Sequence, residues 1–174
     1  MPPADLAELE RSVRRDLDLI AHPRKPWLQP HSVRGAPALD VLIVGAGQCG
    51  LAVGFGLLRD RVDNILLVDR APYGQEGPWV TYARMPTLRS AKDQTGPDLN
   101  VPSLTYQAWH EAQWGAADWQ SMSLIPSGKW NDYLLWFRRV AGLNVRNEAA
   151  VTAIKPLVTG VTVVSAVVSV TVRV

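Results

Sequence analysis

Hydrophobic residues change their spacing along the first part of the chain, and each change predicts a new element. Over residues 5–21, leucine, valine and isoleucine recur every three or four positions with charged residues between them, which predicts an amphipathic helix. Residues 40–44 and 64–69 are instead short apolar runs, typical of buried parallel strands. Residues 48–60, between these runs, have the pattern of a helix. The segment therefore predicts a βαβ unit.

Proline and glycine interrupt these patterns in two places. Four prolines, at positions 23, 26, 30 and 37, make residues 22–37 an arm for which we expect no regular structure. Residues 71–102 are rich in glycine and proline, and we expect long loops there.

The second half of the chain predicts two helices and several strands. The first helix is expected to be capped by Ser103 or Thr105 and to continue to about Gln113. The second is expected to be capped by Ser127 and to end near Gly142. Strands are predicted over 143–146, 150–154 and 168–174.

The glycines after the first apolar run form the most informative motif. Gly45, Gly47 and Gly50 have the spacing G-x-G-x-x-G between a predicted strand and a predicted helix. Gly45 permits a tight turn, Gly47 lets the backbone approach a pyrophosphate, and Gly50 lets the helix pack closely. The free amides at the helix start would receive the phosphates. The motif predicts a Rossmann-like dinucleotide-binding domain, with a turn that serves packing alone as the alternative.

Asp69 ends the second apolar run, about 20 residues after the motif, where a carboxylate accepts hydrogen bonds from a ribose hydroxyl. Its charge argues against a bound 2′-phosphate, although the adjacent Arg70 offers a phosphate ligand. The motif leaves FAD and NAD as the candidate dinucleotides.

Further along, the sequence resembles known flavoenzymes. Gly77-Pro78-Trp79 and residues 85–90 resemble the segment after the second strand in flavin-containing and Baeyer–Villiger monooxygenases, where a Gly-x-Trp and a Pro-x-x-Arg loop lie along the flavin. Weaker similarity, to the ornithine and lysine N-hydroxylases and to the whole group, lies at residues 92–93, 103–106, 125–134 and 143–154. The resemblance implies FAD as cofactor and an NADPH-dependent, monooxygenase-like oxidoreductase.

The motif and the resemblance give a set of expected cofactor contacts. Trp79 and Arg89 would lie beside the flavin, with packing or structural anchoring as the alternative, and the backbone near Val151 would meet the adenine. Cys49 has no second cysteine to resolve a redox reaction, which favours a small helix residue over a redox thiol. The expected contacts are Gly45, Gly47, Gln48, Cys49, Gly50, Asp69, Arg70, Gly77, Pro78, Trp79, Leu88, Arg89 and Val151. We predict no metal site, and the sequence identifies no catalytic residue.

Composition and charge exclude other classes of partner. The net charge of +2, with scattered lysine and arginine, gives no electrostatic case for nucleic acid or an anionic membrane. Residues 157–174 form the longest apolar stretch, but they are fewer than the ~20 residues of a spanning helix, so we interpret them as strand. A single cysteine fits a reducing compartment and predicts a cytoplasmic location.

We expect three regions in an α/β fold. These are an N-terminal helix and proline-rich arm (1–38), a partial three-layer Rossmann-like FAD-binding domain (39–156) and a Val-rich β tail (157–174). Full-length members of the resembled group need NADPH, but no second glycine motif follows residue 154, so we expect a truncated gene product without the NADPH site. The alternatives are a non-catalytic remnant, able to self-associate through its Val-rich strand, and an NAD-dependent dehydrogenase. The sequence does not specify the small-molecule substrate.

Overall fold

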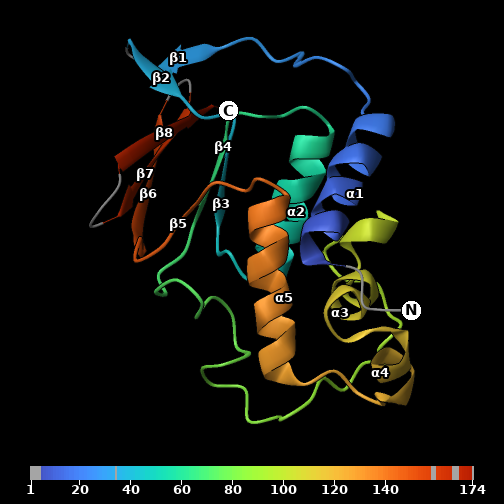
Figure 1. Cartoon of the computed structure of the whole chain (residues 1–174). Coiled ribbons are helices and arrows are strands. Elements are labelled where there is room, and N and C mark those ends of the chain that lie inside the picture. The colour runs from blue at the N-terminus through green and yellow to red at the C-terminus, as the bar shows by residue number, and fades with distance from the viewer. Residues whose placement is uncertain (1–4, 34, 158–159, 166–168, 174) are drawn as a thin grey trace. The chain divides into compact units, whose positions relative to one another are not determined.

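The chain forms two compact units (Figure 1). A computed structural model describes residues 5–33, 35–157, 160–165 and 169–173. We call His22–Gly77 with Leu143–Val174 the sheet unit, and Met1–Ala21 with Pro78–Gly142 the helical unit. Among the helices in these ranges, none is both long and apolar enough to cross a membrane.

The sheet unit is built on the predicted βαβ segment. β3 (Val41–Val44), α2 (Gln48–Arg59) and β4 (Ile65–Val68) follow one another, and a short β5 (Val145–Arg146) adds a third strand. The strands are parallel in the order β3-β4-β5. All four residues of β4 are buried, as predicted. The prediction of a buried strand is wrong for β3, whose last residue Val44 is 60% exposed, because β3 lies at the end of this order.

Opposite faces of the parallel sheet are covered by α2 and by a second sheet. Leu67 of β4 faces α2, since a Cβ on Gly54 would lie 3.2 Å from its Cδ1 atom. Leu66 and Val68 point the other way and pack with Val151. The second sheet contains β6 (Val151–Leu157), β7 (Gly160–Ser165) and β8 (Ser169–Arg173), all antiparallel. Helix, parallel sheet and antiparallel sheet form three layers (Figure 1), which confirms the predicted three-layer, Rossmann-like α/β fold.

The proline-rich arm contains regular structure, contrary to the prediction. β1 (His31–Val33) and β2 (Ala36–Ala38) pair as an antiparallel hairpin. Gly35, with a φ of 79°, lies in the connection, where glycine adopts this conformation without strain. Pro37 is paired opposite Ser32. Proline is tolerated in a ladder at an edge, and this two-stranded hairpin consists of edges only.

The helical unit contains the predicted N-terminal helix and the helices of the middle segment. Its elements are α1 (Leu6–Leu19), the 3₁₀ helix η1 (Pro102–Leu104), α3 (Tyr106–Trp114), α4 (Ala116–Ser121) and α5 (Ser127–Val140). Thr105 caps α3 as predicted, because its Oγ1 accepts the amide hydrogen of Ala108 at 3.1 Å. The expected long loops of residues 71–102 contain an isolated bridge from Thr87 to Pro126 and end where η1 begins.

Two details of the helical unit differ from the sequence prediction. Ser127 does not cap α5. It is the first helical residue after the N-cap Pro126, and its hydroxyl donates to the carbonyl of Met85 at 2.7 Å. The short α4 was not predicted, and its last turn is bound by Lys92, whose Nζ donates to the carbonyls of Trp119 at 2.6 Å and Met122 at 2.7 Å. A cation at this end of a helix neutralises its free carbonyls.

Aromatic rings fill the interior of the helical unit. Tyr106 contacts the rings of Trp109, Trp130 and Tyr133 at centroid distances of 5.4 to 5.5 Å. Trp109, Trp119, Trp130 and Trp136 are buried, whereas Trp114 is 42% exposed.

Two buried tyrosines of this core should respond differently to loss of their hydroxyls. The hydroxyl of Tyr133 donates to the carbonyl of Leu104 at 2.8 Å, so Tyr133→Phe should lower the free energy of unfolding by ~1 kcal/mol. The hydroxyl of Tyr106 is buried without a hydrogen-bond partner among the described residues, so Tyr106→Phe should leave stability unchanged or raise it. Urea denaturation of both variants measures this, and equal losses would contradict the assignment.

The same tyrosines should make the protein sensitive to alkali. Burial raises the pKa of Tyr106, with further contributions from the charges of Asp118 and Asp132, and burial raises the pKa of Tyr133 as well. The unfolded chain releases these protons near pH 10. Stability contributed by the neutral phenols is therefore complete below about pH 10 and falls as pH rises toward the higher folded-state pKa. The urea midpoint should fall between about pH 8 and pH 11, and it should fall less in the double variant Tyr106→Phe, Tyr133→Phe than in the wild type.

Candidate dinucleotide-binding site

The glycine turn joins β3 to α2 in the geometry that the motif predicted. Gly45 has a φ of 102°, a conformation that strains any residue with a side chain. Its amide donates to the carbonyl of Val68 at 2.8 Å, which fixes the turn to the end of β4. Gly47 is the N-cap of α2 and makes no side-chain cap. Within the described residues, no side chain caps the first amides of α2.

The other two glycines of the motif differ in what surrounds them. A Cβ on Gly50 would lie 1.9 Å from the carbonyl oxygen of Gly45, so this glycine is needed for helix and turn to approach at all. A Cβ on Gly47 would lie 3.5 Å from the Cα of Gly77, an ordinary contact distance. Gly50 thus serves the fold, whereas the protein itself leaves room for a methyl group at Gly47.

Asp69 anchors the turn from the end of β4. Its Oδ2 accepts the amide hydrogen of Ala46 at 2.7 Å, and its Oδ1 accepts that of Ala71 at 2.8 Å. The sequence suggested a ribose ligand and gave no sign of this anchoring role. Each carboxylate oxygen can accept a further hydrogen bond, so the ribose contact stays a prediction.

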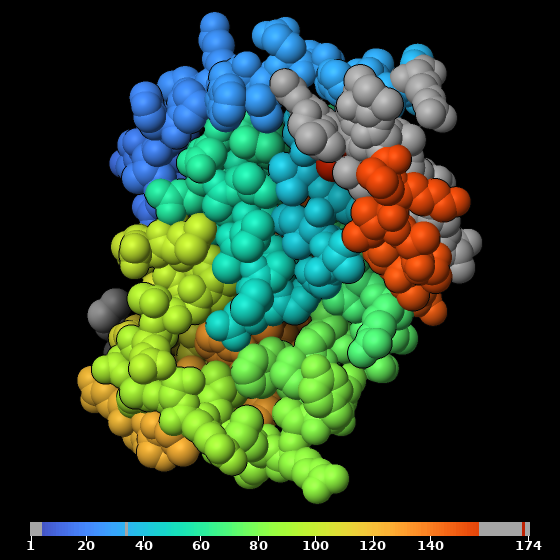
Figure 2. Space-filling model, turned by 180° about the vertical axis from the view of Figure 1, so that it is seen from behind, coloured from blue at the N-terminus to red at the C-terminus, as the bar shows by residue number. Residues whose placement is uncertain are grey.

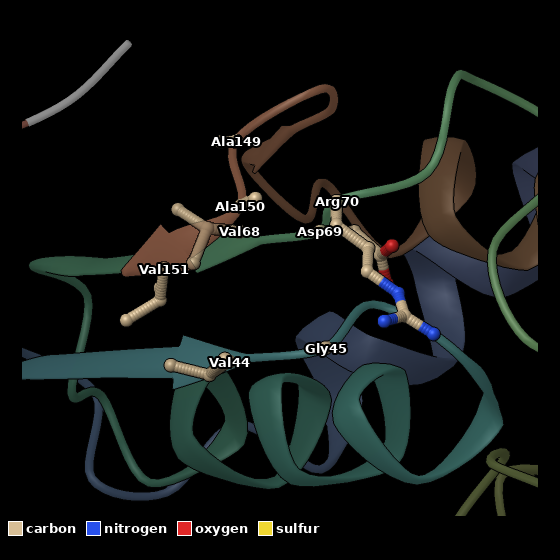
Figure 3. A pocket seen from close by; sticks show the side chains of 8 residues that line it. All are labelled: Val44, Gly45, Val68, Asp69, Arg70, Ala149, Ala150 and Val151. Carbon is tan, nitrogen blue, oxygen red and sulfur yellow. The ribbon is translucent and has the colours of Figure 1, made fainter. Parts of the chain in front are cut away.

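A cleft of about 350 Å³ opens where β3 and β4 end (Figure 3). Its lining residues are Val44, Gly45, Val68, Asp69, Arg70, Ala149, Ala150 and Val151. Apolar side chains from three strand ends form one part, and the Arg70 side chain reaches from the end of β4 toward the glycine turn (Figure 3). The cleft combines an apolar surface with the positive charge of Arg70 and the glycine turn at Gly45. Such a combination suits a nucleotide.

Comparison with known proteins identifies the family. A sequence model of the FAD-NAD(P)-binding family matches residues 42–173. The chain belongs to this family. Over 151 residues it is 51% identical to the FAD-dependent urate hydroxylase of Xanthomonas campestris pv. campestris, an alignment that covers 87% of this chain and 32% of that protein. The chain thus spans about a third of the length of this relative.

Solved structures of other proteins share the fold. L-lysine 6-monooxygenase from Pseudomonas syringae matches with a TM-score of 0.62 at 20% identity, over 77% of this chain and 35% of that one. Bacillithiol disulfide reductase from Staphylococcus aureus matches with a TM-score of 0.60 at 15% identity, over 78% and 36%. The prediction of a FAD-binding, Rossmann-like domain similar to the flavin monooxygenases is confirmed.

The sheet unit of this FAD-NAD(P)-binding protein brings most of the predicted site residues together. Gly45, Asp69, Arg70 and Val151 line the cleft, and Gly77 lies against Gly47 although 30 positions separate them. Gln48, Cys49 and Gly50 form the first turn of α2. Cys49 is exposed, and the outer face of this helix lies at the molecular surface (Figure 2).

Four predicted contacts belong to the helical unit, where the structure shows their local partners. Trp79 packs edge-on against Trp130 at 6.2 Å, and its Nε1 is buried without a hydrogen-bond partner in the described part of the chain. Leu88 is buried, and its amide donates to the carbonyl of Ile125 at 2.8 Å. Arg89 is exposed, and Pro78 accepts the amide hydrogen of Ala83 at 2.9 Å. Contact of these four with a flavin stays a prediction.

Sequence reasoning missed several lining residues of the cleft. Val44 and Val68 occupy the last positions of β3 and β4, and this position was the available signal, because ligands of parallel sheets bind at the carboxyl ends of strands. Ala149 and Ala150 carry no such signal. Within the described residues, no group of three or more histidine, cysteine, aspartate or glutamate side chains could hold a metal ion.

Proposed function

We propose that the chain is the FAD-binding part of a flavin-dependent hydroxylase. The observation that carries this proposal is the 51% identity over 151 residues to a FAD-dependent urate hydroxylase. The residues present suit FAD, because the first amides of α2 have no side-chain cap among the described residues and apolar strand ends line the adjoining cleft. When bound, FAD supplies the redox chemistry that protein side chains lack.

The chain's own residues would bind and orient this cofactor. The turn at Gly47 and the start of α2 would face the pyrophosphate, whose charge the free amides attract. Asp69 would hold the turn and accept a ribose hydroxyl. The apolar surface around Val44 and Val151 would bury the adenine.

Substrate, partners and location are proposals for the whole enzyme. We propose a purine related to urate as its substrate, because the relative is a urate hydroxylase. We also propose NADPH as the reductant, bound outside these residues. We propose a cytoplasmic enzyme that binds neither nucleic acid nor membrane, on its small net charge and single cysteine. Self-association through the Val-rich strands is a further proposal.

The visible absorption spectrum of the purified chain tests the cofactor. We expect flavin bands that survive gel filtration, or that develop on titration with FAD, and weaker binding of NAD⁺ and NADP⁺ added as competitors. A folded protein that stays colourless and ignores FAD would contradict the proposal. Binding of NAD⁺ in place of FAD would favour an NAD-dependent dehydrogenase instead.

Arg70 should contribute to this binding through its charge. Its side chain is exposed, it lines the cleft, and it forms no ion pair or hydrogen bond with the described residues. Arg70→Ala should weaken FAD binding by ~1 kcal/mol or less, a factor of roughly five, because an exposed charge is screened by water. The difference should shrink in high salt. Titrations at low and high ionic strength measure it, with the exposed Arg146→Ala as control.

A further inference from the structure

A buried carboxylate lies in the loop after β4. Glu76 is only 6% exposed. Glutamate is rarely buried to this extent unless its carboxylate is paired. Its Oε1 accepts from Nδ2 of Asn147 at 2.5 Å, and its Oε2 accepts the amide hydrogen of Gly74 at 2.8 Å. Asn147 belongs to the turn between β5 and β6, so this pair joins two segments that are 71 positions apart in the sequence.

Further hydrogen bonds join the same two segments. Nδ2 of Asn147 donates to the carbonyl of Ala71 at 3.1 Å, and the amide of Glu148 donates to the same carbonyl at 3.1 Å. The amide of Ala149 donates to the carbonyl of Asp69 at 2.8 Å. We call these contacts, together with the two hydrogen bonds of the Glu76 carboxylate, the clasp. It fixes the loop from Asp69 to Glu76 along the turn between β5 and β6.

The clasp ends beside the glycine motif. Gly77 directly follows Glu76, and the Cα of Gly77 lies 3.5 Å from the position that a Cβ on Gly47 would take. The backbone at Gly77, which faces the glycine turn at Gly47, is thus fixed by the adjacent buried carboxylate of Glu76. Two apolar side chains would hold the loop at a lower desolvation cost. A carboxylate instead fixes direction, because both of its oxygens require donors in defined places.

We propose that Glu76 and Asn147 are positioning residues that hold Gly77 against Gly47 and thereby set the affinity of the turn for FAD. The proposal rests on the proposed function, since it names residues that shape the same site without touching the cofactor. It does not make Glu76 an acid or a base, because both carboxylate oxygens are engaged within the clasp.

The test compares two isosteric variants with the same change in charge. Glu76→Gln keeps the shape of the side chain and loses one of its two acceptor oxygens, and we expect its dissociation constant for FAD to rise by about tenfold. Asp63→Asn removes an exposed carboxylate of the same unit that lies outside the clasp and should bind FAD as the wild type does. Titrations are made well below the unfolding temperature, with the folded fraction measured by circular dichroism.

Coupling between the two side chains gives a second readout. The second readout is a double-mutant cycle that replaces each member of the pair. Asn147→Ala removes the donor of the hydrogen bond to Oε1 of Glu76, so Glu76→Gln should raise the dissociation constant for FAD less in the Asn147→Ala background than in the wild type. Effects on FAD affinity that simply add would contradict a joint role of the two side chains.

The outcomes separate the two proposals. A wild-type chain that binds no FAD overturns the proposed function together with the clasp. A wild-type chain that binds FAD, with a folded Glu76→Gln variant of equal affinity, overturns only the clasp. A Glu76→Gln variant with a lower melting temperature but wild-type FAD affinity when folded would assign Glu76 to stability alone. That outcome also overturns the clasp proposal.

Discussion

Gly47→Ala is expected to abolish most FAD binding in a protein that still folds. The added methyl group would lie 3.5 Å from the Cα of Gly77, so the unliganded fold has room for it. A pyrophosphate approaching the turn has no such room, because the motif works by bringing bare backbone to the phosphates. We expect the dissociation constant for FAD to rise at least about tenfold, or ~1.4 kcal/mol, with an unchanged melting temperature.

Gly50→Ala is the matched control for this prediction. Its Cβ would lie 1.9 Å from the carbonyl oxygen of Gly45, so helix and turn must separate. We expect a loss of stability of ~3 kcal/mol or more, as in severe overpacking, and a loss of FAD binding that follows unfolding. If Gly47→Ala also unfolds the protein, or if it binds FAD normally, the division of roles between the two glycines is wrong.

Asp69→Ala should damage both stability and cofactor binding. The carboxylate accepts the amide hydrogens of Ala46 and Ala71, and both donors lose their partner in the variant. Hydrogen bonds to a charged group contribute ~1.5–3 kcal/mol each, so we expect a loss of about 3 kcal/mol in the free energy of unfolding. FAD affinity should fall further, because the turn loses its anchor and the ribose its acceptor.

Two variants separate these contributions of Asp69. Asp69→Asn keeps one acceptor oxygen and should lose about half as much stability as Asp69→Ala. Asp63→Asn removes a carboxylate whose partner is the partly exposed Arg61 and should change stability by less than ~1 kcal/mol. Denaturation and FAD titration of the four proteins measure this. A wild-type-like Asp69→Ala would show that the anchor is dispensable.

Local structure was largely readable from the sequence. The apolar runs, the glycine spacing and Asp69 predicted the βαβ unit, the turn and the cofactor class, because each depends on contacts close in the chain. Thr105 was recognised as a cap for the same reason. The same reasoning failed where a distant partner competes with a local one: Ser127 has the residue type of a cap, but its hydroxyl donates to the carbonyl of Met85, 42 positions away.

The sequence by itself determined that this chain has a strand, a glycine turn and a helix fit for a dinucleotide. Tertiary structure decided how the turn is held and what faces it. Val44 is exposed because β3 has one ladder neighbour in the described sheet, which no property of the residue reveals. Asp69 anchors Ala46, and Glu76 reaches Asn147, only because parallel strands bring distant loops to one edge. Such contacts depend on strand order, and a one-dimensional pattern carries no information about it.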